Sequence, residues 1–123
     1  MIIFQNKHFY IEVEPSTLPW LKIFTQTPYK ELTDMPKELR DQLWEIYYII
    51  EEVMRDYFQP DKINMASFAN MLPRVHIHVI ARFKDDAYFP NPVWGERLRD
   101  DKVIKKDFEL FYKEVAKRVE RVK

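Results

Sequence analysis

The feature that most limits the fold of this chain is one long segment with apolar residues at helical spacing. The apolar positions are Leu39, Leu43, Ile46, Ile50, Val53, Met54 and Tyr57. Asp34 and Pro36 predict the helix start, because a carboxylate caps the first turn and a proline there loses no helical hydrogen bond. Pro60 predicts an end near Phe58. Such a helix is about 33 Å long, and its apolar stripe needs a sheet to cover.

Short β-type runs supply that sheet. Residues 2–5 and 9–13 predict a hairpin, and residues 20–24, 62–67 and 75–81 predict three further strands. Short connections between the strands favour antiparallel pairing, with helices on one face. The order β-β-β-α-β-β-α therefore predicts an α+β fold: a mostly antiparallel five-stranded sheet, one long helix and a C-terminal helix.

The remainder of the chain predicts one domain over residues 1–123. A long irregular segment, residues 83–104, carries the chain's only glycine and three large aromatic side chains. Loops of this length in compact domains are usually functional, and the aromatic content argues against simple disorder. Apolar residues then recur at helical spacing, which predicts the C-terminal helix over residues 105–122. The core of the fold is expected within residues 1–95.

Composition excludes several classes of function. There is no cysteine, which removes disulfides, a thiol nucleophile and cysteine-based zinc sites. Lys plus Arg equals Asp plus Glu at 20 each, so no basic excess predicts nucleic acid binding. A single glycine excludes a glycine-rich phosphate loop. No apolar run reaches the roughly 20 residues of a membrane helix, and the first residues do not resemble a secretion signal. We expect a cytoplasmic protein with no membrane partner.

The residues that can carry chemistry lie on the strand predicted near residue 78. Side chains two apart on a strand share a face, so Arg74, His76 and His78 point the same way. The valine and isoleucine side chains between them point toward the core. One face of this strand therefore presents a guanidinium and two imidazoles.

Three interpretations of this row are open. It is a solvent-facing strand, a metal site, or a site of phosphate chemistry. A metal site needs a third ligand, and the other candidates are His8 and the loop carboxylates Asp85 and Asp86. Phosphate chemistry uses what is present: a neutral imidazole attacks phosphorus, a second imidazole holds a proton or an oxygen, and a guanidinium neutralises charge.

Polar side chains just before the strand favour phosphate chemistry. Asn64, Ser67 and Asn70 are short and can donate hydrogen bonds to phosphate oxygens. Each is equally compatible with ordinary turn formation. Together with the absence of a metal-ligand set, they favour a phosphate site with no bound metal and no required cofactor. A magnesium-chelated substrate is compatible with such a site.

The segment 74–80 resembles the histidine triad (HIT) superfamily of hydrolases and transferases, whose hallmark is histidines alternating with apolar residues on a strand. The flanking residues that strengthen the resemblance are 62–73, 81–86, Pro90, Pro92, Val93, Trp94 and Gly95. They are similar to a bacterial subgroup of that family. The resemblance extends upstream through Pro19, Trp20 and Leu21 and covers about residues 1–95.

The resemblance implies roles for individual residues. His76 matches the family's nucleophile, which attacks the α-phosphorus of nucleoside phosphate esters, anhydrides or phosphoramidates and forms a nucleotidyl-histidine intermediate. His78 would contact the phosphate and assist the leaving group, while Asn64 and Asn70 would support the phosphate and the histidine loop. The partner implied is a nucleotide-type small molecule, and the assembly implied is a homodimer that extends one sheet across a two-fold axis.

The departure from the family pattern is Arg74, which replaces the first histidine of the triad. An arginine accepts no proton near neutral pH, but it offers a fixed charge and a fork of donors to a phosphate or to an adjacent backbone carbonyl. A structural ion pair with Asp85 or Asp86 is the alternative role. The replacement leaves two functions open: a hydrolase or nucleotidyl transferase, or a nucleotide-binding sensor with little catalysis. Trp20 and Phe24 are candidates for a base pocket or for the core.

Overall fold

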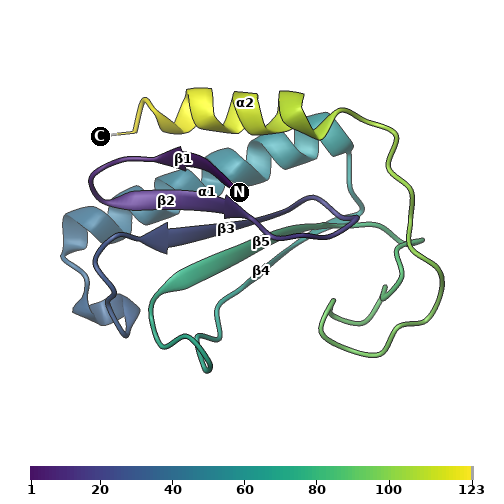
Figure 1. The fold of residues 1–123 in the computed structure, drawn as a ribbon, viewed down its shortest axis with the longest axis horizontal. Helices are drawn as coiled ribbons and strands as arrows, with labels where there is room; N and C mark the ends of the chain where they lie inside the picture. The colour runs from purple at the N-terminus through teal and green to yellow at the C-terminus, as the bar shows by residue number, and fades with distance from the viewer. Residues whose placement is uncertain (123) are drawn as a thin grey trace.

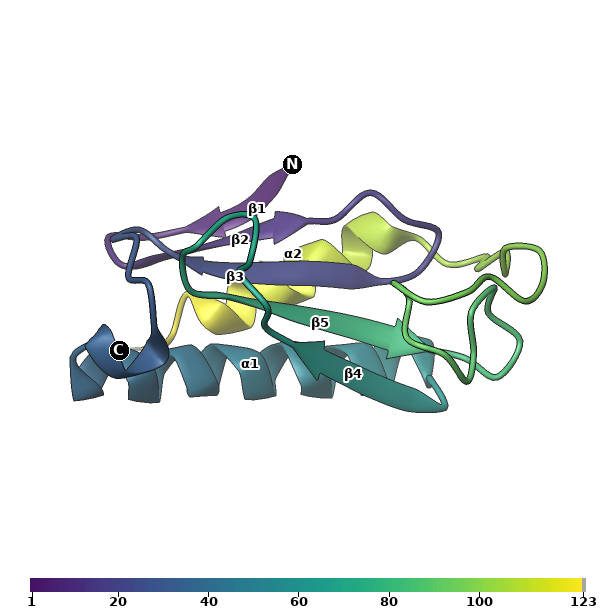
Figure 2. The ribbon, with the colours of Figure 1, turned by 90° about the horizontal axis from the view of Figure 1, so that it is seen from below.

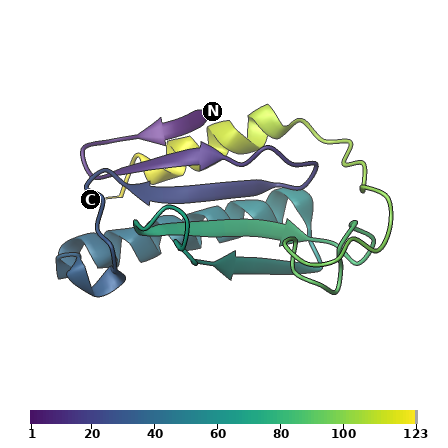
Figure 3. The same ribbon diagram turned by 60° about the horizontal axis from the view of Figure 1, so that its bottom comes forward.

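Five strands form one sheet in the computed structural model, which describes residues 1–122. The elements are β1 (Ile2–Gln5), β2 (Phe9–Val13), β3 (Trp20–Thr25), the 3₁₀ turn η1 (Leu32–Asp34), α1 (Lys37–Phe58), β4 (Lys62–Ala66), β5 (His76–Arg82) and α2 (Phe108–Val119). The strand order is β1-β2-β3-β5-β4, and every neighbouring pair is antiparallel. Strands β1 and β4 form the two edges, with β5 between β3 and β4 (Figure 3).

Both helices cover the same face of the sheet (Figure 1). Helix α1 packs against β3 and β5, and α2 packs against α1 and β1. The core lies in this layer. Leu21 and Ile23 of β3 and Ile77 and Val79 of β5 are at most 1 % exposed. The apolar stripe of α1 therefore meets the apolar face of the sheet, as its periodicity predicts.

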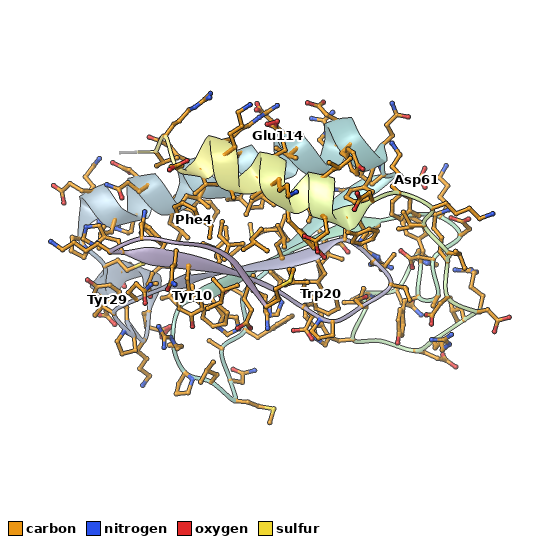
Figure 4. All side chains as sticks on the ribbon, turned by 45° about the horizontal axis from the view of Figure 1, so that its top comes forward. Phe4, Tyr10, Trp20, Tyr29, Asp61 and Glu114 are labelled. Atoms are coloured by element: carbon orange, nitrogen blue, oxygen red, sulfur yellow. The ribbon has the colours of Figure 1, made fainter. Side chains whose placement is uncertain are left out.

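Alternation along β3 and β5 leaves a second face without a helix. Phe24 pairs with His76, Lys22 with His78, and Trp20 with Ile80 across the two strands. In Figure 4, Tyr10 and Trp20 lie on the side of the sheet away from α2. The side chains that carry chemistry therefore occupy the helix-free face.

The predicted α1 is present, and its end matches the sequence. Gln59 ends the helix in the left-handed conformation, with its backbone N–H donating to the carbonyl of Arg55, and Pro60 follows. The predicted start is wrong in detail. Asp34 belongs to η1, where its carboxylate accepts from the backbone N–H of Glu31, and Pro36 is the residue before the first helical position.

The segment after β5 is irregular, as predicted, and runs to Asp107. It extends beyond the end of the sheet before it crosses to α2 (Figure 2). Helix α2 is shorter than the predicted 105–122. The side chain of Asp107 caps its start by accepting from the backbone N–H of Glu109, and the helix ends at Val119. Neither helix among residues 1–122 combines the length and apolar character that crossing a membrane requires.

The predicted fold class is confirmed. The chain is α+β, with a five-stranded antiparallel sheet, one long helix and a C-terminal helix on one face.

Candidate functional site

His76 begins β5 with its ring almost enclosed, at 8 % exposure. Its Nδ1 lies 2.9 Å from the backbone carbonyl oxygen of Arg74. A carbonyl oxygen only accepts hydrogen bonds, so Nδ1 carries the hydrogen in this contact. The neutral ring then has its lone pair on Nε2. The backbone two residues upstream thus fixes the tautomer that an imidazole nucleophile needs.

An aromatic stack holds the His76 ring in place. The ring lies parallel to Phe24, with centroids 4.9 Å apart, and Phe24 stacks on Tyr10 at 4.8 Å. These three side chains come from β5, β3 and β2, in register across the sheet. Phe24 is 5 % exposed. The stack restricts rotation of the imidazole, so Nε2 keeps a fixed direction.

His78 lies beside His76 on the same face, with ring centroids 5.2 Å apart. Its Nδ1 accepts a hydrogen bond of 3.0 Å from the indole Nε1–H of Trp20. Trp94 contacts the ring edge-on at 5.0 Å. Burial, the neighbouring His76 and the charge of Lys22 lower the pKa of His78 to about 4. This imidazole is therefore neutral at pH 7.

A charged cluster adjoins the imidazoles. Lys22, opposite His78 on β3, places its Nζ 3.0 Å from Glu12 and 2.8 Å from Glu14. Burial alone would lower the pKa of Lys22, but hydrogen bonds to the two carboxylates raise it instead. The ammonium therefore stays charged beside the histidine pair.

Arg74 turns its guanidinium toward the end of β3. It donates to the backbone carbonyls of Thr25 and Gln26, and its Cζ lies 5.7 Å above the Phe24 ring. The alternative ion pair of Arg74 with Asp85 or Asp86 is wrong: Asp86 binds Arg82 and Asp85 binds Lys102. Arg74, at the first triad position, thus connects the segment just before β5 to the end of β3.

Asn64 lies on β4, on the face that carries His78, but its amide oxygen is already engaged. It accepts a 2.8 Å hydrogen bond from the guanidinium of Arg82. Arg82 also binds Asp86 at 2.8 Å and the carbonyl oxygen of Asn91 at 2.8 Å. Arg82 is 2 % exposed and Asp86 0 %. Asn64 therefore belongs to the hydrogen-bonded group around Arg82, which holds the loop after β5.

The loop between β4 and β5 carries the remaining predicted polar residues. Asn70 and Ser67 are exposed in it. The ring of Phe68 from the same loop contacts Trp94 at 5.0 Å and is 60 % exposed. Ser67 and Asn70 therefore lie exposed in the loop that supplies Phe68 to the aromatic contact with Trp94.

Two cavities reach the residues around the histidine pair. One of about 400 Å³ is lined in part by Trp20, Tyr88 and Val93. The other, of about 430 Å³, is lined in part by Phe68 and Val75. Each has the size of a small-molecule site. Both cavities are lined by neighbours of the histidines, and neither is lined by His76 or His78.

No group of three His, Asp or Glu side chains among residues 1–122 is arranged to hold a metal ion. The two imidazoles have their Nδ1 atoms engaged by a carbonyl and by an indole. In both rings, therefore, Nε2 is the nitrogen left for a ligand.

Two contributors to this site were missed at the sequence level. Arg82 and Asp86 are four residues apart, a spacing that signals a local ion pair, but nothing local shows that the pair is buried. The contact of Trp20 with His78 joins residues 58 positions apart, and only the strand register brings them together.

Comparison with known proteins decides the family. The model of the HIT domain family matches residues 1–85. The chain belongs to the HIT family. No curated protein matches this HIT-family chain.

Solved structures share the fold of this HIT-family protein. A histidine triad protein from Marinobacter aquaeolei VT8 has 22 % identity and a TM-score of 0.79, covering 100 % of this chain and 90 % of its own. One from Bradyrhizobium japonicum has 24 % identity and a TM-score of 0.78, covering 97 % and 90 %. One from Sinorhizobium meliloti 1021 has 21 % identity and a TM-score of 0.77, covering 95 % and 87 %. Family membership supports a nucleotide-binding function for this chain.

Proposed function

We propose that this HIT-family protein is a hydrolase or nucleotidyl transferase that acts at the α-phosphate of nucleoside phosphate esters, anhydrides or phosphoramidates. His76 is the proposed nucleophile and His78 the second imidazole of the site. The single observation that carries the proposal is the contact of His76 Nδ1 with the carbonyl oxygen of Arg74 at 2.9 Å. It leaves the Nε2 lone pair free for attack, in a ring that stacking holds still.

The proposed reaction has two steps. Nε2 of His76 attacks the α-phosphorus, a nitrogen–phosphorus bond forms, and the bond to the leaving group breaks with its electron pair passing to that group. The ring then carries a positive charge, which the hydrogen bond from Nδ1–H to the Arg74 carbonyl stabilises. In hydrolysis, water attacks the phosphorus and gives up a proton to solvent, while the nitrogen–phosphorus bond breaks and its electron pair returns to Nε2. In transfer, another acceptor replaces water.

The surroundings of His76 supply charge stabilisation. His78 is neutral at pH 7 because its pKa is lowered to about 4, first by burial. It therefore acts on a phosphate oxygen or the leaving atom through an N–H hydrogen bond and not as a cationic acid. Lys22 places a positive charge opposite His78 on β3, within a cluster of two carboxylates. We propose that the side-chain amides of Asn64 and Asn70 donate hydrogen bonds to the phosphate oxygens.

The test replaces the nucleophile. His76→Ala should abolish turnover of adenosine polyphosphates and nucleoside phosphoramidates, a loss of at least 10³-fold, on the order of what removing a nucleophile costs. His8→Ala is the matched control, since His8 lies in the turn between β1 and β2 and not on β5. Full turnover by purified His76→Ala protein would refute the assignment.

The second candidate function is a nucleotide-binding sensor with little catalysis. It is favoured by the engagement of Arg74 with backbone carbonyls, which leaves no proton acceptor at the first triad position. Under this alternative, calorimetry detects nucleoside monophosphate binding, while no ester, anhydride or phosphoramidate is turned over. Measurable turnover that depends on His76 would reject it.

The remaining proposals concern the context of the site. We expect a homodimer in which the sheet continues across a two-fold axis, a nucleotide-type partner, no nucleic acid partner, a cytoplasmic location and no required cofactor. Magnesium would enter only as an ion chelated by the phosphates of the substrate. Light scattering at several protein concentrations tests the dimer, and turnover in the presence of a chelator tests the metal requirement.

A further inference from the structure

We infer that Trp20 is a positioning residue for His78. Its indole N–H fixes His78 as the tautomer with hydrogen on Nε2, so that the pair presents a lone pair at position 76 and a donor at position 78. The inference rests on the proposed function for its catalytic meaning, but the tautomer itself is a property of the protein alone.

The chemistry of the donor makes the assignment unambiguous. The Nε1 of Trp20 lies 3.0 Å from Nδ1 of His78. An indole nitrogen only donates, whereas a hydroxyl or a second imidazole in this place either donates or accepts. Nδ1 of His78 must therefore be the acceptor and carries no hydrogen. In a neutral imidazole the hydrogen is then on Nε2.

The two histidines are fixed in opposite senses by two different partners. A carbonyl oxygen requires hydrogen on Nδ1 of His76, and the indole forbids hydrogen on Nδ1 of His78. The ring centroids are 5.2 Å apart on one face of β5. A phosphate between the Nε2 atoms would therefore meet a nucleophile on one side and an N–H donor on the other.

Trp20 is itself held in position. It starts β3, pairs with Ile80 of the same strand as the histidines, and packs edge-on against Trp94 at 5.4 Å. The indole is thus fixed by the sheet on one side and by the long loop on the other. This arrangement keeps the N–H directed at Nδ1 of His78.

The charges around His78 support the same state. His76 on β5 and Lys22 on β3 disfavour a cationic His78, while Glu14, beyond the end of β2, favours it. Burial opposes the charge most strongly, and the pKa is lowered to about 4. Protonating Nδ1 would also break the bond from Trp20. His78 is therefore a neutral donor over the range in which most enzymes work.

The experiment reads the tautomer directly. Protein labelled with ¹⁵N in histidine is studied by long-range ¹H–¹⁵N correlation between pH 4 and 8, as wild type, Trp20→Phe and Trp94→Phe. In the wild type well above the pKa of His78, that ring should show hydrogen on Nε2 only, and a Nδ1 resonance shifted by an accepted hydrogen bond. In Trp20→Phe, the Nδ1 resonance should move to that of an unbonded nitrogen, a form with hydrogen on Nδ1 should emerge, and the pKa should rise.

The control variant separates the effect of losing the indole hydrogen bond from the effect of replacing a large side chain that contacts His78. Trp94 also contacts the His78 ring, edge-on, but donates no hydrogen bond to it, so Trp94→Phe should keep the wild-type Nδ1 resonance and the Nε2–H form. Hydrogen on Nδ1 in the wild type, or an Nδ1 resonance unchanged in Trp20→Phe, would overturn the inference. The wild-type spectrum decides this even where Trp20→Phe does not fold.

Turnover distinguishes this inference from the proposed function. If the inference and the function both hold, kcat of Trp20→Phe falls at least several-fold, while KM changes less. If the spectra are as expected but no variant and no wild type turns over any substrate, the function fails and the positioning role of Trp20 stands. If wild type turns over substrate with His78 protonated on Nδ1, the function stands and the inference fails.

Discussion

The buried carboxylate of Asp86 gives the sharpest prediction about stability. Its oxygens accept from Arg82 at 2.8 and 3.0 Å and from the backbone N–H groups of Phe83, Tyr88 and Phe89 at 2.8 to 3.0 Å. Arg82 is 2 % exposed and Asp86 is fully buried. Asp86→Asn removes the countercharge of a buried guanidinium while keeping the side chain's shape.

The expected cost follows from that burial. Breaking a buried ion pair by neutralising one partner costs about 3–5 kcal/mol, a large part of the roughly 5–15 kcal/mol by which domains are stable. The matched control is Asp101→Asn, because Asp101 pairs with Arg97 at the same i, i+4 spacing but 48 % exposed. An exposed pair contributes less than about 1 kcal/mol.

Acid provides an independent measurement of the same group. Burial alone would raise the pKa of Asp86, but Arg82 and the backbone donors outweigh it and lower the pKa to about 2. The pKa of Asp86 is thus lower in the folded protein than in the unfolded chain. The ionised carboxylate therefore makes its full contribution to the free energy of unfolding above about pH 4, and that contribution is lost as the pH falls through about 2. It amounts to about 2 kcal/mol at 1.36 kcal/mol per pH unit.

Urea denaturation followed by tryptophan fluorescence measures both effects. Asp86→Asn should lower the free energy of unfolding by about 3 kcal/mol or more, and it should flatten the dependence on acid below pH 4. Asp101→Asn should change neither. A loss in Asp86→Asn no larger than in the control would show that the pair does not anchor the loop.

Three further predictions concern single side chains. Arg74→Lys keeps the charge but loses the fork that reaches the carbonyl of Thr25, and should cost about 1 kcal/mol in urea denaturation; an unchanged free energy of unfolding would contradict the structural role. Lys22→Met removes a charge that lowers the pKa of His78, so NMR titration should show that pKa rising, and a fall would refute the assigned sign. Leu43→Ala opens the core at a fully buried position of α1 and should cost about 2–5 kcal/mol, with a value below 1 kcal/mol excluding tight packing there.

The parts of the site that follow a local rule were predictable. Alternation along residues 74–80 places His76 and His78 on one face and the apolar residues in the core, as observed. The period of α1 and the proline after it predicted a helix to Phe58, which is its last residue. These features depend on neighbours within one element, where side-chain geometry is fixed by the backbone.

The rest depends on tertiary contacts that no local pattern encodes. Asn64 faces Arg82 across β4 and β5, so its amide serves a buried guanidinium before any phosphate. Asp34 was expected to cap α1, but it closes the preceding 3₁₀ turn with Glu31 instead. Trp20 was a candidate for the core or a base pocket, and strand register brings its N–H to His78.

Residues that the family pattern does not describe were hardest to interpret. Arg74 replaces a histidine, and its guanidinium was as compatible with a phosphate or a carboxylate as with a carbonyl. The end of β3 lies alongside the start of β5, so the carbonyls of Thr25 and of the next residue, Gln26, can accept from Arg74. A sequence gives no measure of which acceptor lies nearest when three are plausible.

The most direct test of the central claim is to trap and map the covalent intermediate. Wild-type protein is mixed with an adenosine phosphoramidate, quenched in alkali, where phosphorus–nitrogen bonds to histidine survive, and digested for mass spectrometry. We predict one adenylyl group, attached to the peptide that contains His76, with fragment ions placing it on that residue. An adduct on His78, or rapid turnover with no adduct at either imidazole, would contradict the account.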